Sequence, residues 1–267
     1  MRISLFTFLL IFSLCLNAQE DWQLDTTISI DQAQQVYADH LGNVYLINKW
    51  TVTKYSPDFE EKFIYNNPGL GEITYLNIFN PFNVMVYYQD YNQFVFLDNK
   101  LNPNLNAFEP AVQGYFDVQW AATFDENDIW FYDQVSDKMY RWSLTQNKEL
   151  NTSLQVSPLA GSETRPNFMW ATLKNVYLNI PDVGILVFDN FGSYQKTFPI
   201  THLNEFYLSE SSIVFLNKGQ LEYFNDFTKN SKIRKLPTIE FVDFCFAEDR
   251  IYLLEKGQLK IFTTGKK

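Results

Sequence analysis

The chain has 267 residues, of which 21 are basic and 31 acidic, so its net charge is −10 with neutral histidines. This excess of acid opposes binding to nucleic acid or to anionic lipid, which both attract clustered Lys and Arg side chains. The length suits one large domain with a substantial core. With only two cysteines in the chain, the fold cannot depend on a disulfide framework.

The first 18 residues have the pattern of a secretory signal peptide that is cleaved after Ala18. Arg2 supplies a positive charge, Ile3–Leu16 is almost wholly apolar, and polar residues follow from Asn17. This apolar stretch is short for a membrane span. The expected mature chain, residues 19–267, has 249 residues, a net charge of −11 and no transmembrane segment. We therefore expect an exported single domain that is periplasmic, associated with the outer membrane, or extracellular.

The two cysteines bear on anchoring and on chemistry. Cys15 leaves a lipoprotein open as an alternative, although Leu14 is larger than the residue that usually precedes a lipidated cysteine. Cys245 has no partner in the mature chain and lies in the apolar run 241–246. A lone cysteine in such a run is typical of a small buried core residue, and no nearby histidine would activate it as a nucleophile.

The mature chain opens on a strand-like segment, Leu24–Ile30, and six copies of a weak repeat follow. In each copy a polar turn precedes a short strand that begins with a β-branched residue. These six marker strands are Val44–Leu46, Val84–Val86, Ile129–Phe131, Val176–Leu178, Ile213–Phe215 and Ile251–Leu253. Their starts are 40, 45, 47, 37 and 38 residues apart. A period near this value is typical of four-stranded propeller blades.

Further strands flank each marker. An apolar strand before it is predicted to be the innermost of its blade, at 36–37, 75–79, 116–121, 168–171, 206–208 and 241–246. The strand after it ends on an aromatic residue 11 to 13 positions beyond the marker's start, at Tyr55, Phe96, Trp142, Phe188, Phe224 and Phe262. Such near-constant spacing is typical of hairpins. The outermost strands are predicted at Lys62–Tyr65, Thr152–Val156, Gln195–Ile200 and Lys232–Leu236.

The two ends of the repeat array complement each other. The sixth copy reaches Lys267 with no room for a fourth strand, whereas Leu24–Ile30 is left over before the first copy. Pairing the two removes a free sheet edge. The predicted fold is therefore all-β, a six-bladed β-propeller whose last blade is closed by the N-terminal strand. Most of the 25 Phe, 16 Tyr and 6 Trp are expected to fill the wedges between blades.

No residue pattern amounts to a catalytic signature. The only histidines, His40 and His202, are far apart in sequence, which argues against a zinc site, and His40 is interpreted as a turn residue. The sequence has no Gly-x-Ser-x-Gly elbow, phosphate loop or dinucleotide fingerprint. We therefore expect a binding protein without a cofactor, and whether any catalysis occurs is left open.

Two hypotheses follow from the predicted fold. The first is a binding or scaffold protein that recognises a partner on one rim of the channel, where aromatic and charged loop residues suit protein or peptide recognition: Trp50, Tyr91, Tyr115, Arg165 and His202. The second, from analogy with other six-bladed propellers, is a calcium-dependent lactonase-like hydrolase with the metal in the channel. Polar residues close to the inner strands are Gln35, Glu72, Asp117, Asn167, Glu205 and Asp243, and the conceivable metal ligands among them are Glu72, Asp117, Asn167 and Asp243.

With this repeat, the chain resembles the six-bladed propeller proteins exported by Bacteroidota, which have an NHL- or TolB-like propeller architecture. The segment from residues 70–74 through residues 94–100 carries the likeness best. The resemblance implies a propeller fold and a location in the cell envelope, and it implies no reaction. The expected partner is another envelope protein or a peptide.

Overall fold

The structure is a computed structural model that describes residues 22–104, 107–161, 165–209 and 211–264. The predicted signal peptide, residues 1–18, and Cys15 lie outside these ranges. Within them, strands dominate, accompanied by three short 3-10 helices, η1 (Pro68–Leu70), η2 (Gln89–Tyr91) and η3 (Pro110–Gln113), and by the four-residue helix α1 (Ser157–Ala160). No helix of the described part is long and apolar enough to cross a membrane.

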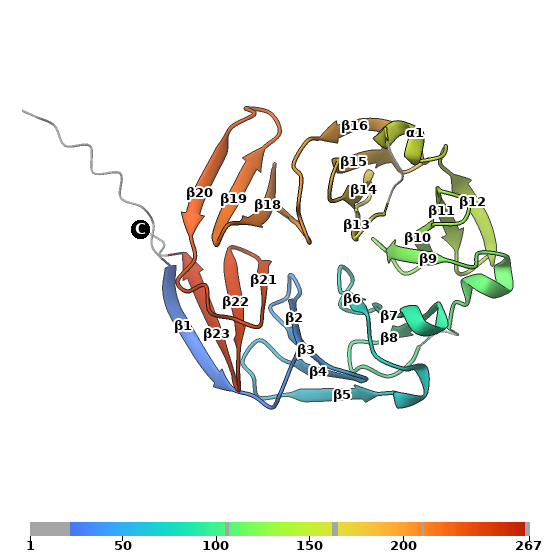
Figure 1. Ribbon diagram of the computed structural model, residues 1–267. Coiled ribbons are helices and arrows are strands. Elements are labelled where there is room, and N and C mark those ends of the chain that lie inside the picture. The colour runs from blue at the N-terminus through green and yellow to red at the C-terminus, as the bar shows by residue number, and fades with distance from the viewer. Residues whose placement is uncertain (1–21, 105–106, 162–164, 210, 265–267) are drawn as a thin grey trace, which may run out of the picture.

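Six antiparallel sheets are arranged around a common axis, so the chain is a six-bladed β-propeller, as predicted (Figure 1). Blade 1 consists of β2 (Gln35–Ala38), β3 (Val44–Asn48), β4 (Thr51–Tyr55) and β5 (Lys62–Asn66), and blade 2 of β6 (Tyr75–Asn77), β7 (Val84–Tyr88) and β8 (Gln93–Leu97). Blade 3 consists of β9 (Val118–Ala122), β10 (Asp128–Asp133), β11 (Lys138–Ser143) and β12 (Lys148–Thr152), and blade 4 of β13 (Phe168–Ala171), β14 (Asn175–Ile180), β15 (Gly184–Asp189) and β16 (Tyr194–Phe198). Blade 5 consists of β17 (Tyr207–Ser209), β18 (Ser212–Asn217), β19 (Gln220–Asn225) and β20 (Ser231–Lys235), and blade 6 of β21 (Asp243–Ala247), β22 (Arg250–Glu255), β23 (Gln258–Thr264) and β1 (Trp22–Ser29).

The ring is closed by the predicted pairing of the two ends of the chain. Strand β1 runs antiparallel to β23, from the pair Trp22↔Thr264 to the pair Ser29↔Gln258, with an irregularity between Leu24 and Thr26. In Figure 1 the blue β1 lies along the outer edge of the red blade 6. The last blade therefore contains strands from both ends of the sequence, which leaves β23 without a free edge.

The central hairpins of five blades have the register that the sequence spacing predicts. In five blades the first residue of the marker pairs directly with the predicted aromatic residue: Val44↔Tyr55, Ile129↔Trp142, Val176↔Phe188, Ile213↔Phe224 and Ile251↔Phe262. In blade 2, Val84 pairs with Leu97 instead, and Phe96 pairs with Met85. The spacing varies from 11 to 13 residues because the turns between paired strands differ in length.

One of the four predicted outermost strands differs from the structure. The expected strand Thr152–Val156 was wrong, because β12 occupies Lys148–Thr152 and Val156 is fully buried beside α1. An exposed edge needs no apolar residues, so this polar strand gave no hydrophobic signal. In blade 2 the described residues form no regular outer strand, and isolated bridges Phe94↔Phe108 and Leu97↔Pro103 cover β8.

The hydrophobic core is divided among the wedges between neighbouring blades. Six clusters of buried side chains each join residues of two adjacent blades, including the wedge between blades 6 and 1. Large rings are prominent in them, and Trp130, Tyr45, Tyr87 and Phe131 are fully buried. The expectation that most aromatic residues fill the core is confirmed. Every blade therefore depends on both of its neighbours for burial of its faces.

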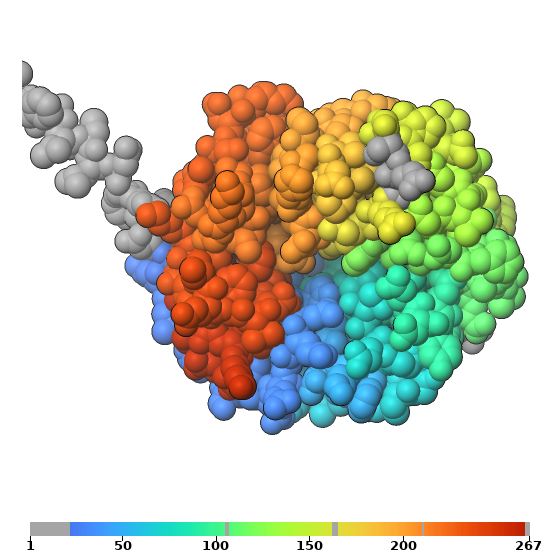
Figure 2. All heavy atoms as spheres, viewed as in Figure 1, coloured from blue at the N-terminus to red at the C-terminus, as the bar shows by residue number. Residues whose placement is uncertain are grey.

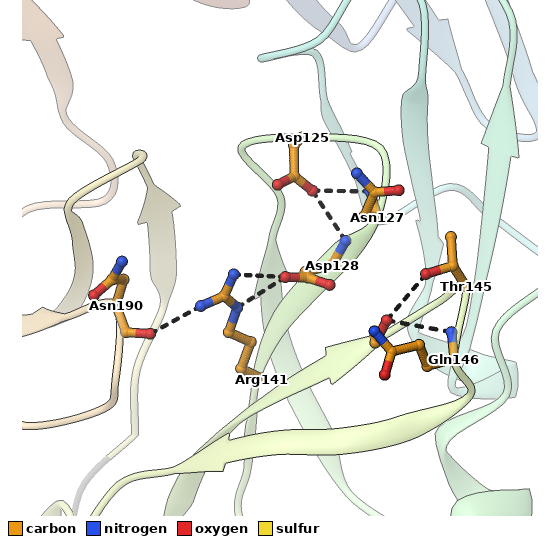
Figure 3. A network of polar contacts seen from close by, with 8 residues as sticks. Asp125, Asn127, Asp128, Arg141, Thr145, Gln146 and Asn190 are labelled. Carbon is orange, nitrogen blue, oxygen red and sulfur yellow. Dashed lines mark hydrogen bonds and ion pairs between the residues drawn. The ribbon is translucent and has the colours of Figure 1, made fainter.

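One arginine adds a polar link between blades 3 and 4 (Figure 3). The Nε and Nη2 atoms of Arg141 on β11 donate to Oδ2 of Asp128 at 2.9 and 2.6 Å, and its Nη1 donates to the carbonyl oxygen of Asn190 in blade 4 at 3.1 Å. Asp125 accepts hydrogen bonds from the amides of Asn127 and Asp128, which holds the turn before β10. The side chains of Arg141 and Asp128 are only 18% and 9% exposed. The pair is therefore largely shielded from water.

Replacing Arg141 with methionine is expected to lower the free energy of unfolding by about 2–3 kcal/mol, because the carboxylate of Asp128 would remain buried without its cation. Urea denaturation of the two proteins would measure the difference. The double variant Arg141→Met with Asp128→Asn removes both charges and should recover most of the loss. An unchanged midpoint for Arg141→Met alone would show that the pair does not contribute.

Candidate functional site

Aromatic rings of the innermost strands narrow the central channel. Ring centroids lie 4.8 Å apart for Tyr75 of β6 and Trp120 of β9, and 6.2 Å apart for Trp120 and Phe168 of β13. The belt continues from Trp170 to Tyr207 of β17, at 6.5 Å. A cavity lies toward each end of this belt. Figure 2 views the ring from one face, whose centre is hollowed between the blue segment of blade 1 and the orange segments of blade 5.

The first cavity, here named the carboxylate cavity, has a volume of about 440 Å³ and lies where the innermost strands begin. Its acidic residues are Glu205, just before β17, and Asp243, the first residue of β21. Oδ2 of Asp243 accepts a hydrogen bond from the amide of Val36 at 2.8 Å, which links blades 6 and 1. Oε1 of Glu205 accepts one from the Tyr207 hydroxyl, also at 2.8 Å. Both carboxyls are thus held in place from the channel wall.

The position of these acids in the channel disfavours their charged forms. Burial, and then the charge of Asp243, raises the pKa of Glu205 to about 7, against the opposing effect of the Tyr207 hydrogen bond. Burial raises the pKa of Asp243 to about 6, although the amides of Val36 and Phe244 donate to its carboxylate. Amide side chains of Gln35, Asn167 and Asn204 complete the polar lining, and His202 lies at the mouth. Among the described residues that line this cavity there is no Lys or Arg.

Replacing Glu205 with glutamine is expected to stabilise the protein by about 3–4 kcal/mol at pH 8 and by about 1 kcal/mol at pH 5. The folded-state pKa of this carboxyl is above its unfolded value, so its ionisation costs stability as the pH rises from about 4.3 toward the folded value of about 7. Below that window the carboxyl is neutral in both states and the cost disappears. The ionisable groups that face it are Asp243, Tyr37, Tyr207 and Cys245, and all are retained in the variant.

Urea denaturation of both proteins at pH 5 and pH 8 measures this effect. The control is Glu240→Gln, which removes an exposed carboxylate from the loop before β21 and should change neither value. A gain that is the same at both pH values would contradict the explanation from ionisation.

The second cavity, here named the opposite cavity, has a volume of about 540 Å³ and lies where the innermost strands end. It is lined by Phe79, Trp170 and Cys245, with His40 and Glu248 from the turns. His40 lies in the turn between β2 and β3, as predicted. This cavity was not predicted from the sequence, because binding was expected on the loops at the other end of the channel.

Two polar groups at the opposite cavity have structural roles. Asp39 accepts hydrogen bonds from the amides of Leu41 and Asn43 and from the Tyr45 hydroxyl, so its carboxylate organises the turn. Cys245 is a free, buried cysteine, and the prediction of a small core residue is confirmed. Burial raises the pKa of its thiol well above the usual value, which keeps it in the unreactive protonated form.

The five predicted rim residues lie on loops at the face of the carboxylate cavity, but they are not gathered into one site. Only His202 lines the cavity itself. Trp50 and Tyr91 are 38% and 60% exposed in the turns of blades 1 and 2. Arg165 is exposed and lines a neighbouring depression of about 520 Å³. Tyr115 is built into blade 3, where its hydroxyl donates to Glu149 at 2.8 Å and its ring packs against the rings of Phe131, Tyr140 and Trp142.

The four conceivable metal ligands are also spread out. Asn167 and Asp243 line the carboxylate cavity, Asp117 lines the depression beside Arg165, and Glu72 is exposed on the loop before β6. Both ends of the Asn167 amide are already bonded, to the Leu203 carbonyl and the Asn179 amide, at 2.9 and 2.6 Å. The described residues contain no group of three or more His, Cys, Asp and Glu side chains arranged to hold a metal ion.

Glu205 lines the carboxylate cavity, although it was not predicted as a site residue. It was counted among the polar residues near the inner strands, but not among the site residues. Its position two residues before Tyr207 repeats the position of Gln35 before Tyr37, and both pairs are joined by a hydrogen bond from the tyrosine hydroxyl at 2.8 Å. Since alternate residues of a strand share a face, this spacing is the signal that could have placed Glu205 in the channel.

Comparison with known proteins supports the fold. No family model and no curated protein matches the sequence. Among solved structures, a chain of the mitotic checkpoint complex is 8% identical with a TM-score of 0.65, and the alignment covers 100% of this chain and 99% of that one. The Pan2 WD40 domain of Neurospora crassa is 8% identical with a TM-score of 0.62, covering 93% and 97%. Virginiamycin B lyase from Staphylococcus aureus is 12% identical with a TM-score of 0.58, covering 92% and 90%. At such low identity these likenesses establish the β-propeller fold, which serves as a binding domain in some proteins and as an enzyme in others.

Proposed function

We propose that this protein is a non-enzymatic binding or scaffold protein of the bacterial cell envelope, which recognises a protein or peptide partner with the loops around the carboxylate cavity. The observation that carries the proposal is a set of exposed apolar side chains on those loops. Besides Trp50 and Tyr91 it includes Phe116, Val135 and Val242, which are 70%, 71% and 55% exposed. Exposed aromatic and aliphatic groups around a concave, partly polar centre are typical of recognition surfaces.

Two further observations support this function. The signal-peptide pattern of residues 1–18 favours export, and therefore a partner in the envelope. The structural neighbours include a WD40 domain and a chain of the mitotic checkpoint complex, so propellers of this shape occur in multiprotein assemblies. A protein-interaction role is consistent with both.

The test is cross-linking and capture of the tagged full-length protein in its native host. The wild type is compared with a rim variant that has three substitutions and with a control variant that has two. The rim variant carries Trp50→Ala, Tyr91→Ala and His202→Ala. The control carries Phe191→Ala and Phe227→Ala, which removes two aromatic side chains that are 65% and 85% exposed on the loops of the other face. We expect one partner to be recovered with the wild type and the control and lost with the rim variant.

The opposite pattern, with the partner lost only from the control, would assign recognition to the other face. Recovery of no partner by any of the three proteins, together with a measurable hydrolase activity, would overturn the binding function. The mass of the exported protein tests the proposed location, because cleavage after Ala18 leaves Gln19 as the first residue.

A calcium-dependent lactonase-like hydrolase is the second candidate, and one observation favours it. Asp243 and Asn167, two of the proposed ligands, share the carboxylate cavity with Glu205. A cation that binds only the folded state raises its stability by mass action. The hydrolase proposal therefore predicts a higher melting temperature in calcium than in chelator, whereas identical melting curves would count against it.

A further inference from the structure

The carboxylate cavity contains two acids without a cationic partner among the described residues. Neither Glu205 nor Asp243 forms an ion pair with a Lys, Arg or His of the described part. Oε1 of Glu205 is bonded to Tyr207, and no donor of the described residues is bonded to its Oε2. Both acids are half-buried, and carboxylates withdrawn from water are usually paired with a positive group. The cavity therefore lacks the charge that would balance it.

The walls of the same cavity are aromatic, which is an independent feature that favours a cation. Trp120, Phe168, Tyr37 and Tyr75 line it together with the two acids. Aromatic faces attract cations through the ring quadrupole, and the attraction is strongest where water is excluded. A guanidinium group combines stacking on such faces with two parallel hydrogen bonds to a carboxylate.

The size of the cavity indicates a side chain as its ligand. A water molecule occupies about 30 Å³ in the liquid, so the cavity of about 440 Å³ has far more room than one metal ion needs. The mouth, at His202 and Asn204, is exposed on the face that carries the apolar loop residues. A partner seated on those loops could extend one long side chain inward to the acids.

We propose that the carboxylate cavity receives the guanidinium group of an arginine side chain from the partner protein or peptide, with Glu205 and Asp243 as its acceptors and the aromatic belt as its wall. This inference rests on the proposed function and adds the chemistry of the partner. The net charge of −10 would also favour the approach of a basic partner.

The test is a titration of the mature protein, residues 19–267, with a blocked Gly-Arg-Gly peptide and with the same peptide in which citrulline replaces arginine. Citrulline preserves the shape of the side chain and removes its charge. We expect the arginine peptide to bind at least tenfold more tightly, measured by calorimetry or by NMR shifts. Glu205→Gln should reduce the arginine affinity to about that of citrulline. The matched control is Glu248→Gln, which removes a carboxylate from the opposite cavity and should leave the affinity unchanged.

Equal affinity for the two peptides, or equal losses in Glu205→Gln and Glu248→Gln, would overturn the inference. Calcium chloride alone is a further probe, and a calcium-induced shift that Glu205→Gln abolishes would assign the cavity to a metal instead. Melting curves of both variants show whether they are folded. A partner captured through the rim without any preference for arginine would contradict this inference and leave the proposed function intact. Tight binding of the arginine peptide with no captured partner would agree with this inference and count against the proposed function.

Discussion

A mature chain that starts at Ile30, without β1, is expected to lose at least about 5 kcal/mol of stability, the lower end of what natural domains possess. Strand β1 is paired with β23 along its whole length, from Trp22 to Ser29. Trp22 and Ile28 also pack against the clusters between blades 5 and 6 and between blades 6 and 1. Its removal would expose the edge of β23 and undo the pairing within blade 6 that closes the ring.

A further contact makes the loss larger than a missing edge strand alone would cause. The guanidinium of Arg234, in β20 of blade 5, lies 4.8 Å from the ring centroid of Trp22. The strand therefore joins blade 5 as well as blade 6. Since each wedge is buried only while both of its blades are in place, weakening blade 6 also weakens the wedges on both sides of it.

Urea denaturation followed by tryptophan fluorescence would measure the loss of stability. A circularly permuted variant provides the control. Trp22 pairs with Thr264, so residues 22–29 can be moved to the C-terminus and joined by a short linker after Lys267. This rearranged chain should recover most of the stability. A truncated chain with the wild-type midpoint would show that the closure of the ring does not contribute.

The architecture could be predicted because its central hairpins are marked by residue type. In five of the six hairpins a β-branched residue pairs with an aromatic residue, as in Val44↔Tyr55 and Ile251↔Phe262, and these residues are needed to fill the wedges. Outer strands carry no such requirement. Lys148–Thr152 is a polar edge strand, and its position follows from backbone pairing with β11 rather than from burial. Its sequence therefore looks like that of a loop.

The site was only partly predictable, because a cavity depends on which side chains from different blades meet. The predicted topology gives the loop on which each rim residue lies, but it does not give the packing of each aromatic ring. The ring of Tyr115 packs into blade 3 rather than facing a partner, because Phe131 and Tyr140 provide an apolar surface for it. The proximity of Glu205 and Asp243 results from the meeting of β17 and β21 in the channel, 38 residues apart in sequence. No local pattern encodes that distance.

Replacing Trp130 with alanine is expected to lower the free energy of unfolding by about 3–5 kcal/mol, the usual cost of removing a large buried side chain. Trp130 on β10 is fully buried between blades 3 and 4, where its neighbours in the core cluster include Met169 and Leu178. The strands around it are fixed by pairing on both sides, so they cannot collapse into the space that the indole leaves. Urea denaturation would measure the loss.

Trp50→Ala is the matched control, because it removes the same side chain from an exposed turn. Trp50 is 38% exposed, and its only charged ring contact among the described residues is Lys49, 5.5 Å from the ring centroid. Its replacement should change the unfolding free energy by no more than about 0.5 kcal/mol, and it should weaken partner capture if the rim is the recognition surface. A large loss of stability in Trp50→Ala would show that this tryptophan supports the blade rather than the partner. A small loss in Trp130→Ala would show that the wedge can repack, which would contradict the view that closely packed rings hold neighbouring blades together.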